Sequence, residues 1–396
     1  MIEAIASGQA AISREATRKK VLAGVFVAIG TALVMWIWII GALKSPQTGW
    51  DFPVFYIPAH LPVHLLYSRD AFAAFWREHL SPLGVPHWAP YVRPAIFSLL
   101  LRPLSALPYQ QAMWLWLAGG VTAYFAAIAV LIRRFKLPGF LFTAYAAFFP
   151  ALAGTVSGAD ITVYLLALTL ALVLLECRRD GLAGCALIVG LCKFNLIMLI
   201  PVVLLFHRRF RAFMFLAGGA VFVAASSMVL TPLGDYIAAM IDAPRKTAGF
   251  FPVGLKGFST AIGQPWCYPV LVAIILVVCC GLMRRLPFTE AFCIAVTGSL
   301  LIVPYVTWYD STLLALPLAV IYARGGTVVR IICVSVLAAV PLWLHGGGYN
   351  GPIGFMHVGV ELFILGYFAY MADLCRLSFR ALGSPGTNER RTIACE

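Results

Sequence analysis

Apolar residues come along this chain in long, nearly unbroken blocks, and short polar or basic stretches separate them. Most blocks hold roughly 17 to 25 residues, which as an α-helix is long enough to cross about 30 Å of hydrocarbon. Strands of a membrane barrel would alternate apolar and polar positions, and these blocks do not. The pattern therefore predicts an all-α protein, a polytopic integral membrane helical bundle.

The blocks predict about ten full spans and one further apolar segment of a different kind. The predicted spans are residues 21–43, 110–132, 138–155, 161–176, 212–230, 268–283, 289–306, 311–323, 327–344 and 353–371. Residues 21–371 are expected to form a single transmembrane domain.

Composition and charge support a membrane protein. The chain of 396 residues is 62% hydrophobic and 11% charged, whereas about a quarter of a soluble domain is charged. Its net charge of +13 does not predict a nucleic-acid partner, because the basic clusters lie in short stretches between apolar blocks. That placement is the positive-inside pattern, which sets these stretches and both termini in the cytoplasm. We expect a basic cytoplasmic arm at residues 1–20 and a cytoplasmic tail at residues 372–396.

The ten cysteines show no metal-ligand spacing, and most lie in or beside apolar blocks. They are interpreted as packing residues. Neither a metal ion nor a cofactor is predicted.

Two long segments are predicted on the outer side, residues 44–109 after the first span and residues 231–266. The first is rich in Trp, Tyr, Phe and Leu, a composition that does not suit a disordered loop. Within it, residues 69–80 have a helical period with one apolar and one charged face, which predicts an interfacial helix.

The apolar segment 182–206 has two interpretations. As one full span it would place one of its two flanking basic loops outside. As a re-entrant hairpin of two short helices it keeps both loops inside, which fits the charge rule better. The hairpin would also set Lys193 at its tip, deep in the membrane.

Among the predicted outer acids, Asp51 and Asp310 stand in aromatic surroundings. Asp310 has a second interpretation as the N-cap of the span that follows it. For Asp51 a cap is less favoured, because Pro53 and Pro58 are expected to interrupt any early helix. A carboxylate shielded by aromatic rings can accept a proton from an attacking hydroxyl, so Asp51 is predicted to be a general base.

Cations predicted near the same outer membrane boundary as Asp51 indicate the kind of substrate on which the base would act. His87, Arg93 and Arg102 lie in the segment "HWAPYVRPAIFSLLLRPLSALP", and Lys193 is costly in the membrane without a partner. Such cations can hold a lipid phosphate. The alternatives are ordinary phospholipid headgroups for the arginines, and an internal ion pair or snorkelling for Lys193. The combination predicts transfer of a group from a lipid-phosphate carrier, and one displacement with one base inverts the sugar carbon.

The order of several short motifs carries a resemblance. Asp51 and Tyr56 follow the first block, and "LLYSRDAF" and "APYVRPAIFSLLLRPLSALP" come next. A glycine motif at Gly158, "LAGCALIVGLCK" ending at Lys193, and Tyr309-Asp310 follow later. This order resembles glycosyltransferase family 87, the polyprenyl-phosphate-mannose-dependent enzymes with the GT-C membrane fold. The family's Pro-Pro is Val92-Arg93-Pro94 here, and its Gly-Gln is Gly158-Ala159.

The resemblance implies a membrane glycosyltransferase that moves a sugar, expected to be mannose, from a polyprenyl-phosphate donor to a glycolipid or glycan acceptor. Asp51 would be the catalytic base, and the implied phosphate ligands are Arg93, Lys193, His87 and Arg102. The implied sugar or acceptor contacts are Tyr56, Tyr91, Asp160, Tyr309 and Asp310. The site would face the periplasm from a bacterial inner membrane, among membrane lipids. Two other classes stay open, a lipid or sugar-lipid transporter and a non-catalytic subunit of envelope glycan assembly.

Overall fold

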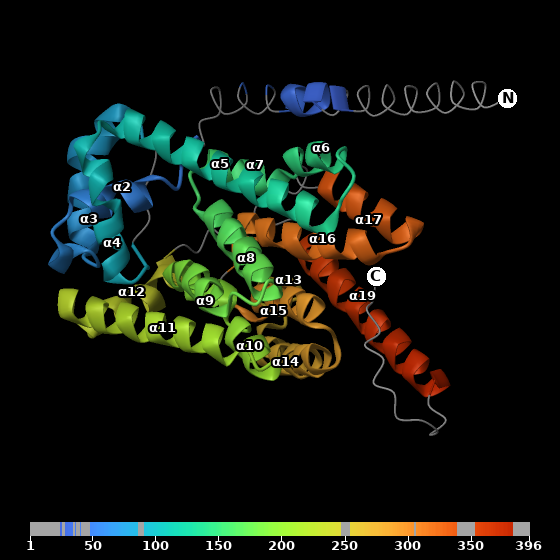
Figure 1. Cartoon of the computed structure of the whole chain (residues 1–396). Coiled ribbons are helices and arrows are strands. Elements are labelled where there is room, and N and C mark those ends of the chain that lie inside the picture. Colours follow the sequence, from blue (N-terminus) through green and yellow to red (C-terminus); the bar gives the residue numbers. More distant parts are fainter. Residues whose placement is uncertain are drawn as a thin grey trace.

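A computed structural model describes residues 24–25, 28–34, 36, 40, 48–85, 91–246, 254–304, 306–338 and 353–382. Every regular element in these ranges is helical, which confirms the predicted all-α class (Figure 1). The predicted arm at 1–20, most of the first span, His87 and the end of the tail lie outside the described residues.

The helices differ widely in length. The longer ones are α5 (Tyr109–Phe135), α8 (Ile161–Glu176), α11 (Phe210–Leu230), α12 (Leu233–Lys246), α14 (Tyr268–Arg285), α15 (Phe288–Ile302), α17 (Thr327–Ala338) and α19 (Ile353–Leu382). The shorter ones are α2 (Pro53–His60), α3 (Arg69–Phe75), α4 (Ala95–Leu101), α6 (Leu141–Ala146), α7 (Phe149–Val156), α9 (Asp180–Ile188), α10 (Ile200–Phe206), α13 (Leu255–Ala261) and α16 (Ala315–Arg324). The 3₁₀ helices are η1 (Val63–Leu65), η3 (Ser81–Leu83), η4 (Arg102–Ala106), η5 (Val189–Ile197), η6 (Pro265–Cys267) and η7 (Trp308–Leu314). The wider turn η2 (Trp76–Leu80) is a π-helix.

Five helical stretches in the described part of the chain are long and apolar enough to cross a membrane. They are Tyr109–Phe135, Asp180–Ile197, Phe210–Leu230, Pro265–Arg285 and His357–Leu374. The membrane character predicted from the sequence is thus supported. The larger number of spans predicted above stays a prediction.

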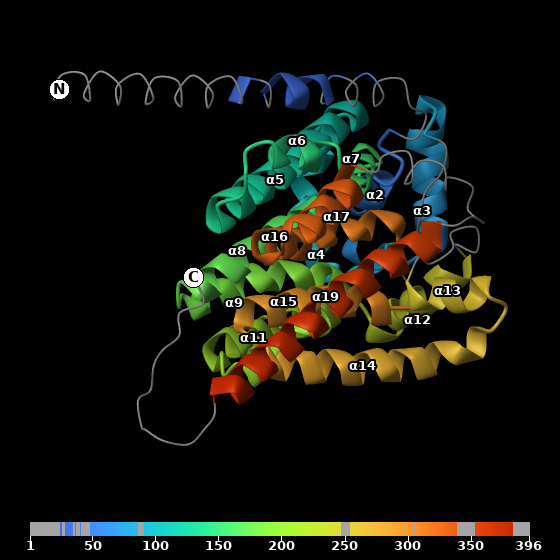
Figure 2. The same ribbon diagram turned by 90° about the vertical axis from the view of Figure 1, so that its right-hand side faces the viewer.

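The helices pack in a layered order. α8 lies between α5 and α9, and α9 in turn packs along α11 (Figure 1). On the other side of the bundle α15 is buried from Thr289 to Ile302. It packs against α14, α16 and α19, and Figure 2 shows α14, α15 and α19 side by side.

Glycine permits the closest of these contacts. A Cβ added at Gly184 of α9 would lie 2.5 Å from the Cβ of Phe215 in α11, so no larger residue fits there unless a backbone moves. At the start of the same two helices, Arg209 Nη1 donates to Asp180 Oδ1 at 3.1 Å. The two turns that precede α9 and α11 therefore lie together.

Residues 48–85 and 91–108 form a compact helical unit with its own hydrophobic cluster, which includes Phe52, Leu66, Phe72 and Tyr91. The helix predicted at residues 69–80 is present as α3 followed by η2. The expectation that Pro53 and Pro58 exclude an early helix is wrong, because α2 begins at Pro53. Proline suits the first helical position, since its missing N–H has no partner in a helix there.

The span predicted at residues 138–155 is also corrected. It is two short helices, α6 and α7, and Pro150 lies in the first turn of α7. The break brings the end of α7 beside the chain that enters α2, and this contact builds the candidate site.

Candidate active site

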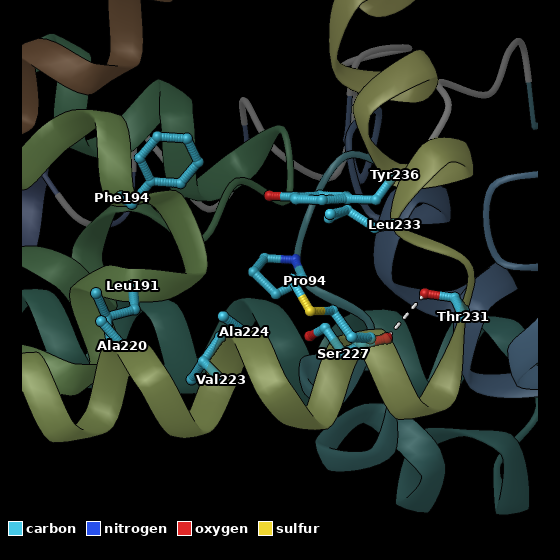
Figure 3. A pocket seen from close by; sticks show the side chains of 11 residues that line it. Pro94, Leu191, Phe194, Ala220, Val223, Ala224, Ser227, Thr231, Leu233 and Tyr236 are labelled. Carbon is cyan, nitrogen blue, oxygen red and sulfur yellow. Dashed lines mark hydrogen bonds between the residues drawn. The ribbon is translucent and has the colours of Figure 1, made fainter.

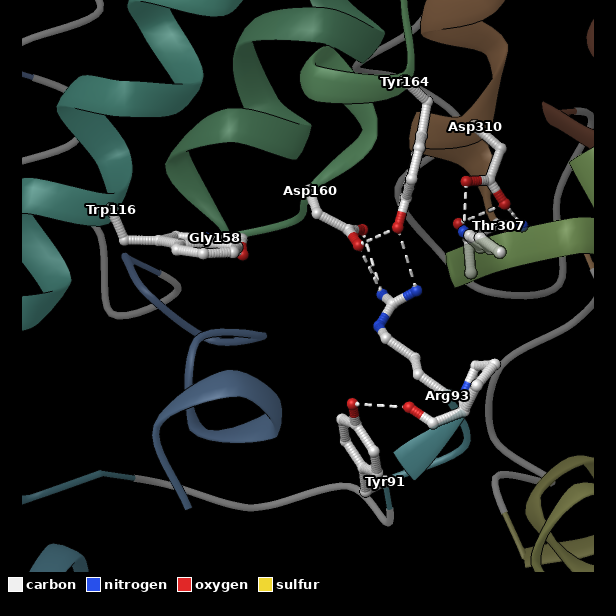
Figure 4. A network of polar contacts seen from close by, with 10 residues as sticks. Tyr91, Arg93, Trp116, Gly158, Asp160, Tyr164, Thr307 and Asp310 are labelled. Carbon is white, nitrogen blue, oxygen red and sulfur yellow. Dashed lines mark hydrogen bonds and ion pairs between the residues drawn. The ribbon is translucent and has the colours of Figure 1, made fainter. Parts of the chain in front are cut away.

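Asp51 is held by the turn that follows α7. The Asp51 N–H donates to the Ser157 carbonyl at 2.5 Å, and the Gly49 N–H donates to the Val156 carbonyl at 2.9 Å. Gly158 has φ +88°, and a Cβ there would lie 2.9 Å from the Phe52 nitrogen. Its carbonyl accepts from Trp116 Nε1 of α5 at 2.9 Å (Figure 4). A side chain at position 158 would push the Asp51 segment away.

The Ser157 hydroxyl is the nearest polar partner of the Asp51 side chain. Ser157 Oγ lies 3.0 Å from Asp51 Oδ2 and 2.8 Å from the Gly154 carbonyl. A serine hydroxyl carries one hydrogen, so it can donate to only one of these oxygens at a time. Sequence reasoning missed Ser157. Its only signal was its place next to Gly158, and the contact with Asp51 joins residues far apart in the chain.

The environment makes Asp51 more basic than an ordinary aspartate. Burial raises the pKa of its carboxyl to about 6, because desolvation disfavours the charged form. The Ser157 hydroxyl, Lys193 and Arg93 oppose this rise in pKa, and the charge of Asp160 adds to it. A carboxylate with such a pKa is ionised at neutral pH and accepts a proton readily.

Arg93 forms the first of two ion pairs near Asp51. Its Nη2 lies 2.9 Å from Asp160 Oδ2, and its Nη1 donates to the Tyr164 hydroxyl at 3.3 Å (Figure 4). The guanidinium carbon lies 5.0 Å from the centre of the Phe55 ring, which suits a cation–π contact. Arg93 Nε is buried and has no hydrogen-bond partner among the described residues.

Lys193 forms the second ion pair. Its Nζ pairs with Asp310 Oδ1 and lies 5.3 Å from the centre of the Tyr309 ring. The backbone of Lys193 leaves the helical region at φ −134° and ψ 61°, which interrupts η5. Of the alternatives drawn from the sequence, an internal ion pair for Lys193 is therefore the one observed.

Asp310 has a structural role as well, though not the predicted one. Thr307 N and Thr307 Oγ1 both donate to Asp310 Oδ2 at 2.9 Å (Figure 4). Asp310 is thus the third residue of a capping box in which Thr307 is the N-cap, and the sequence expectation of an Asp310 N-cap is corrected.

Other predicted site residues lie apart from this cluster or serve the scaffold. Arg102 donates to the carbonyls of Ala59 and Leu61 at 3.2 and 2.7 Å, where it holds the end of α2. The Tyr56 hydroxyl donates to the Leu107 carbonyl at 3.0 Å. The buried Tyr91 hydroxyl donates to the Pro94 carbonyl at 3.4 Å (Figure 4).

The arrangement combines one carboxylate of raised pKa with two cations that already have carboxylate partners. Asp51 forms no ion pair with any described residue. Such a site can remove a proton at Asp51 while cationic N–H groups stabilise negative charge that grows nearby.

Comparison with known proteins adds one finding. The sequence model of glycosyltransferase family 87 matches residues 91–306, more than half of the chain. The match includes Arg93, Asp160 and Lys193, whereas Asp51 lies before it. No curated protein and no solved structure matches the chain.

Proposed function

The chain belongs to glycosyltransferase family 87 and is a membrane glycosyltransferase. From this premise we propose that it moves a sugar, mannose by the family resemblance, from a polyprenyl phosphate to an acceptor hydroxyl with inversion. The observation that carries the proposal is Asp51, a carboxylate with a pKa of about 6 and no ion-pair partner among the described residues.

In the proposed reaction Asp51 takes the proton of the acceptor hydroxyl. The acceptor oxygen forms a bond to the anomeric carbon while the bond from that carbon to the phosphate oxygen breaks. The electron pair leaves with the phosphate, which is a good leaving group and needs no general acid. Attack from the face opposite the phosphate inverts the anomeric centre.

Ser157 would serve Asp51 in both protonation states. While Asp51 is ionised, the Ser157 hydroxyl donates to Asp51 Oδ2, 3.0 Å away. Once Asp51 is protonated, it donates to Ser157 Oγ instead, and the serine hydrogen turns to the Gly154 carbonyl at 2.8 Å. In both states Asp51 Oδ2 and Ser157 Oγ would stay hydrogen-bonded to each other, so proton uptake would not leave either of these two atoms without a partner.

Arg93 and Lys193 would hold the donor phosphate. Arg93 Nε is a buried donor without a partner among the described residues, and a lysine ammonium has three N–H groups, of which Asp310 occupies one. The phosphate would use these remaining donors, while Asp160 and Asp310 keep the two cations in place. Charge that grows on the leaving phosphate then meets cations already oriented toward it.

The segment 182–206 fits a re-entrant hairpin in this proposal. Its support is the contact between Asp180 and Arg209, which brings the two flanking turns together, and the break at Lys193. A single span would need these turns on opposite sides of the membrane. With such a hairpin, and with the basic loops in the cytoplasm, Lys193 and the active site would face the outer, periplasmic side of a bacterial inner membrane.

The hairpin is tested by labelling two exposed turn residues. Single cysteines at Arg178 and Arg208, in a chain whose ten native cysteines are replaced, should both react with an impermeant thiol reagent only after the membrane is opened. Reaction of one cysteine from outside and the other from inside would contradict the hairpin.

The function is tested with purified protein in liposomes that contain a mannosyl polyprenyl phosphate and membrane glycolipids as acceptors. We expect release of polyprenyl phosphate and a mannosylated product whose anomeric configuration, read by NMR, is opposite to that of the donor. Retention of configuration would contradict the single-displacement mechanism, and use of a nucleotide sugar instead would contradict the lipid donor.

A further inference from the structure

One face of α11 forms the wall of a long apolar groove. The residues on this face recur at spacings of three and four, as one side of a helix requires. They are Phe213, Leu216, Ala217, Ala220, Val223, Ala224, Ser227 and Met228. Three of the eight are alanines, and their small side chains leave room in front of the helix.

Across from α11, the segment that carries Lys193 forms the second wall of the groove. Leu191, Phe194, Met198 and Pro201 line this second wall. Phe194 and Met198 are 42% and 48% exposed, so the groove is open along its side rather than enclosed. In a membrane such an opening faces the lipid, and a lipid molecule can enter it sideways.

The groove consists of two neighbouring cavities along α11. One holds about 220 Å³ and reaches Pro94, Leu233 and Tyr236 (Figure 3). The other holds about 240 Å³ and extends to Phe213 and Pro201. Leu191, Phe194 and Ala220 line both, so the two cavities adjoin. We call the combined cavity the α11 groove.

The length of the α11 groove is comparable to the thickness of a membrane. From Phe213 to Met228 the helix advances fifteen residues, or about 22 Å at 1.5 Å per residue. The hydrocarbon core of a bilayer is about 30 Å thick. An extended hydrocarbon chain could therefore lie against α11 over most of that depth.

The polar end of the groove adjoins the candidate phosphate ligands. Pro94 follows Arg93 directly and Phe194 follows Lys193, so both cations stand next to residues of the groove wall. Ser227, Thr231 and Tyr236 supply hydroxyl groups at this end, whereas the lining toward Phe213 is apolar. An amphiphile with an anionic head and a long apolar tail matches this distribution of charge.

We propose that the α11 groove holds the hydrocarbon tail of the donor lipid along its length, so that the protein distinguishes donors by tail length. The inference rests on the proposed function, because it assigns the tail of the same lipid phosphate. The donor is favoured over a lipid acceptor because the groove wall is continuous in sequence with the phosphate-binding cations. Asp51, which must meet the acceptor, is held instead by the turn after α7.

The test uses three phenylalanine substitutions on α11 and two donors. Ala224→Phe fills the groove near its polar end, and Ala217→Phe fills its deep half. Ala225→Phe is the matched control, because Ala225 is exposed and does not line either cavity. The donors carry the same sugar phosphate, one with a tail of about half the 22 Å length and one that exceeds it.

Wild type should use the long-tailed donor with the higher kcat/KM. Ala224→Phe should lower kcat/KM for both donors by about ten- to a hundredfold, the range for a filled apolar pocket. Ala217→Phe should lower it by a similar factor for the long tail alone. Ala225→Phe should leave both donors within about twofold.

Equal effects of Ala217→Phe and Ala225→Phe on the long-tailed donor would overturn the inference, as would a wild type indifferent to tail length. Those outcomes leave the proposed function standing. A wild type that uses neither donor would instead contradict the proposed function. A photoreactive group at the end of the long tail provides a check on the unmodified protein. It should crosslink near Phe213 to Ala217, and crosslinks confined to α14 or α19 would contradict the groove.

Discussion

The carboxylates at the ends of several helices and the Asp51 carboxylate of the candidate active site differ in their partners. At the turns between helices, each of three acids pairs with an arginine. These pairs are Arg134–Glu176 at 2.6 Å, Arg209–Asp180 at 3.1 Å and Arg324–Glu290 at 3.2 Å. In the candidate active site Asp160 pairs with Arg93 and Asp310 pairs with Lys193, but Asp51 pairs with no cation among the described residues. Its close side-chain partner is the neutral Ser157 hydroxyl.

In the proposed function this difference separates the structural acids from the reactive one. A cation beside a carboxylate stabilises the charged form and makes the group a weaker base. A carboxylate that is shielded from water but lacks such a partner keeps a raised pKa, as Asp51 does at about 6. Perturbed groups of this kind gather at active sites, since their position serves chemistry rather than stability.

The largest expected effect comes from Asp51→Asn. The amide keeps the shape of the side chain and can still accept from Ser157, but it cannot take a proton. Turnover should fall about 10²- to 10⁴-fold, the usual contribution of a general base. Asp70→Asn, on the exposed face of α3, is the matched control and should keep wild-type turnover. Turnover above about a tenth of wild type in Asp51→Asn would remove Asp51 from this role.

The next effect concerns the cations of the site. Arg93→Gln and Lys193→Gln should each lower kcat/KM for the donor by about 10²- to 10³-fold, since each removes charge that stabilises the leaving phosphate. The apparent affinity for the acceptor should change little. Arg134→Gln at a helix turn should leave donor kinetics within about threefold.

Each cation variant also leaves a carboxylate unpaired, so a folding defect must be separated from a binding defect. The double variant Arg93→Gln/Asp160→Asn removes both charges and should regain thermal stability without regaining donor use. If donor affinity recovered together with stability, Arg93 would have only a structural role.

The arginine–carboxylate pairs at the turns between helices should affect stability rather than donor kinetics when they are broken. Arg209→Gln leaves Asp180 partly buried without its cation, and the free energy of unfolding should fall by about 1–3 kcal/mol, between exposed and buried pairs. A lower midpoint of thermal unfolding with nearly unchanged kcat per folded molecule would separate this region from the active site. A large loss of kcat at unchanged stability would place Arg209 in the chemistry.

The sequence predicted the helices well because apolar block length is a strong signal. α8 was predicted at its observed bounds, residues 161–176, and α5 and α11 within a few residues. The break between α6 and α7 was missed, because Pro150 inside an apolar block does not reveal where the chain bends. The helix at Pro53 was missed because a proline at the first helical position and one in an interior look alike in sequence.

The site was predictable in part. Charge is scarce in this chain, so Asp51, Arg93 and Lys193 were visible as exceptions in an apolar sequence. Their partners were not, because the pairing of Lys193 with Asp310 joins residues more than a hundred positions apart. Serine is common in such chains, so nothing set Ser157 apart until the fold brought it to Asp51.

Substitution of Ser157 has the smallest expected effect, but it tests most directly the central claim that Asp51 is the general base. It shifts the pKa of Asp51 without removing the residue. The measurement is the pH dependence of kcat/KM for wild type, Ser157→Ala and Ser157→Thr. A base must be deprotonated, so wild-type kcat/KM should rise with pH up to about 6 and then level off.

The Ser157 hydroxyl lowers the pKa of Asp51, so its loss in Ser157→Ala should raise that pKa and move the acidic limb to higher pH. Ser157→Thr retains a hydroxyl and should keep the wild-type limb. An acidic limb that stays in place in Ser157→Ala, or a wild-type profile flat between pH 5 and 8, would contradict Asp51 as the base.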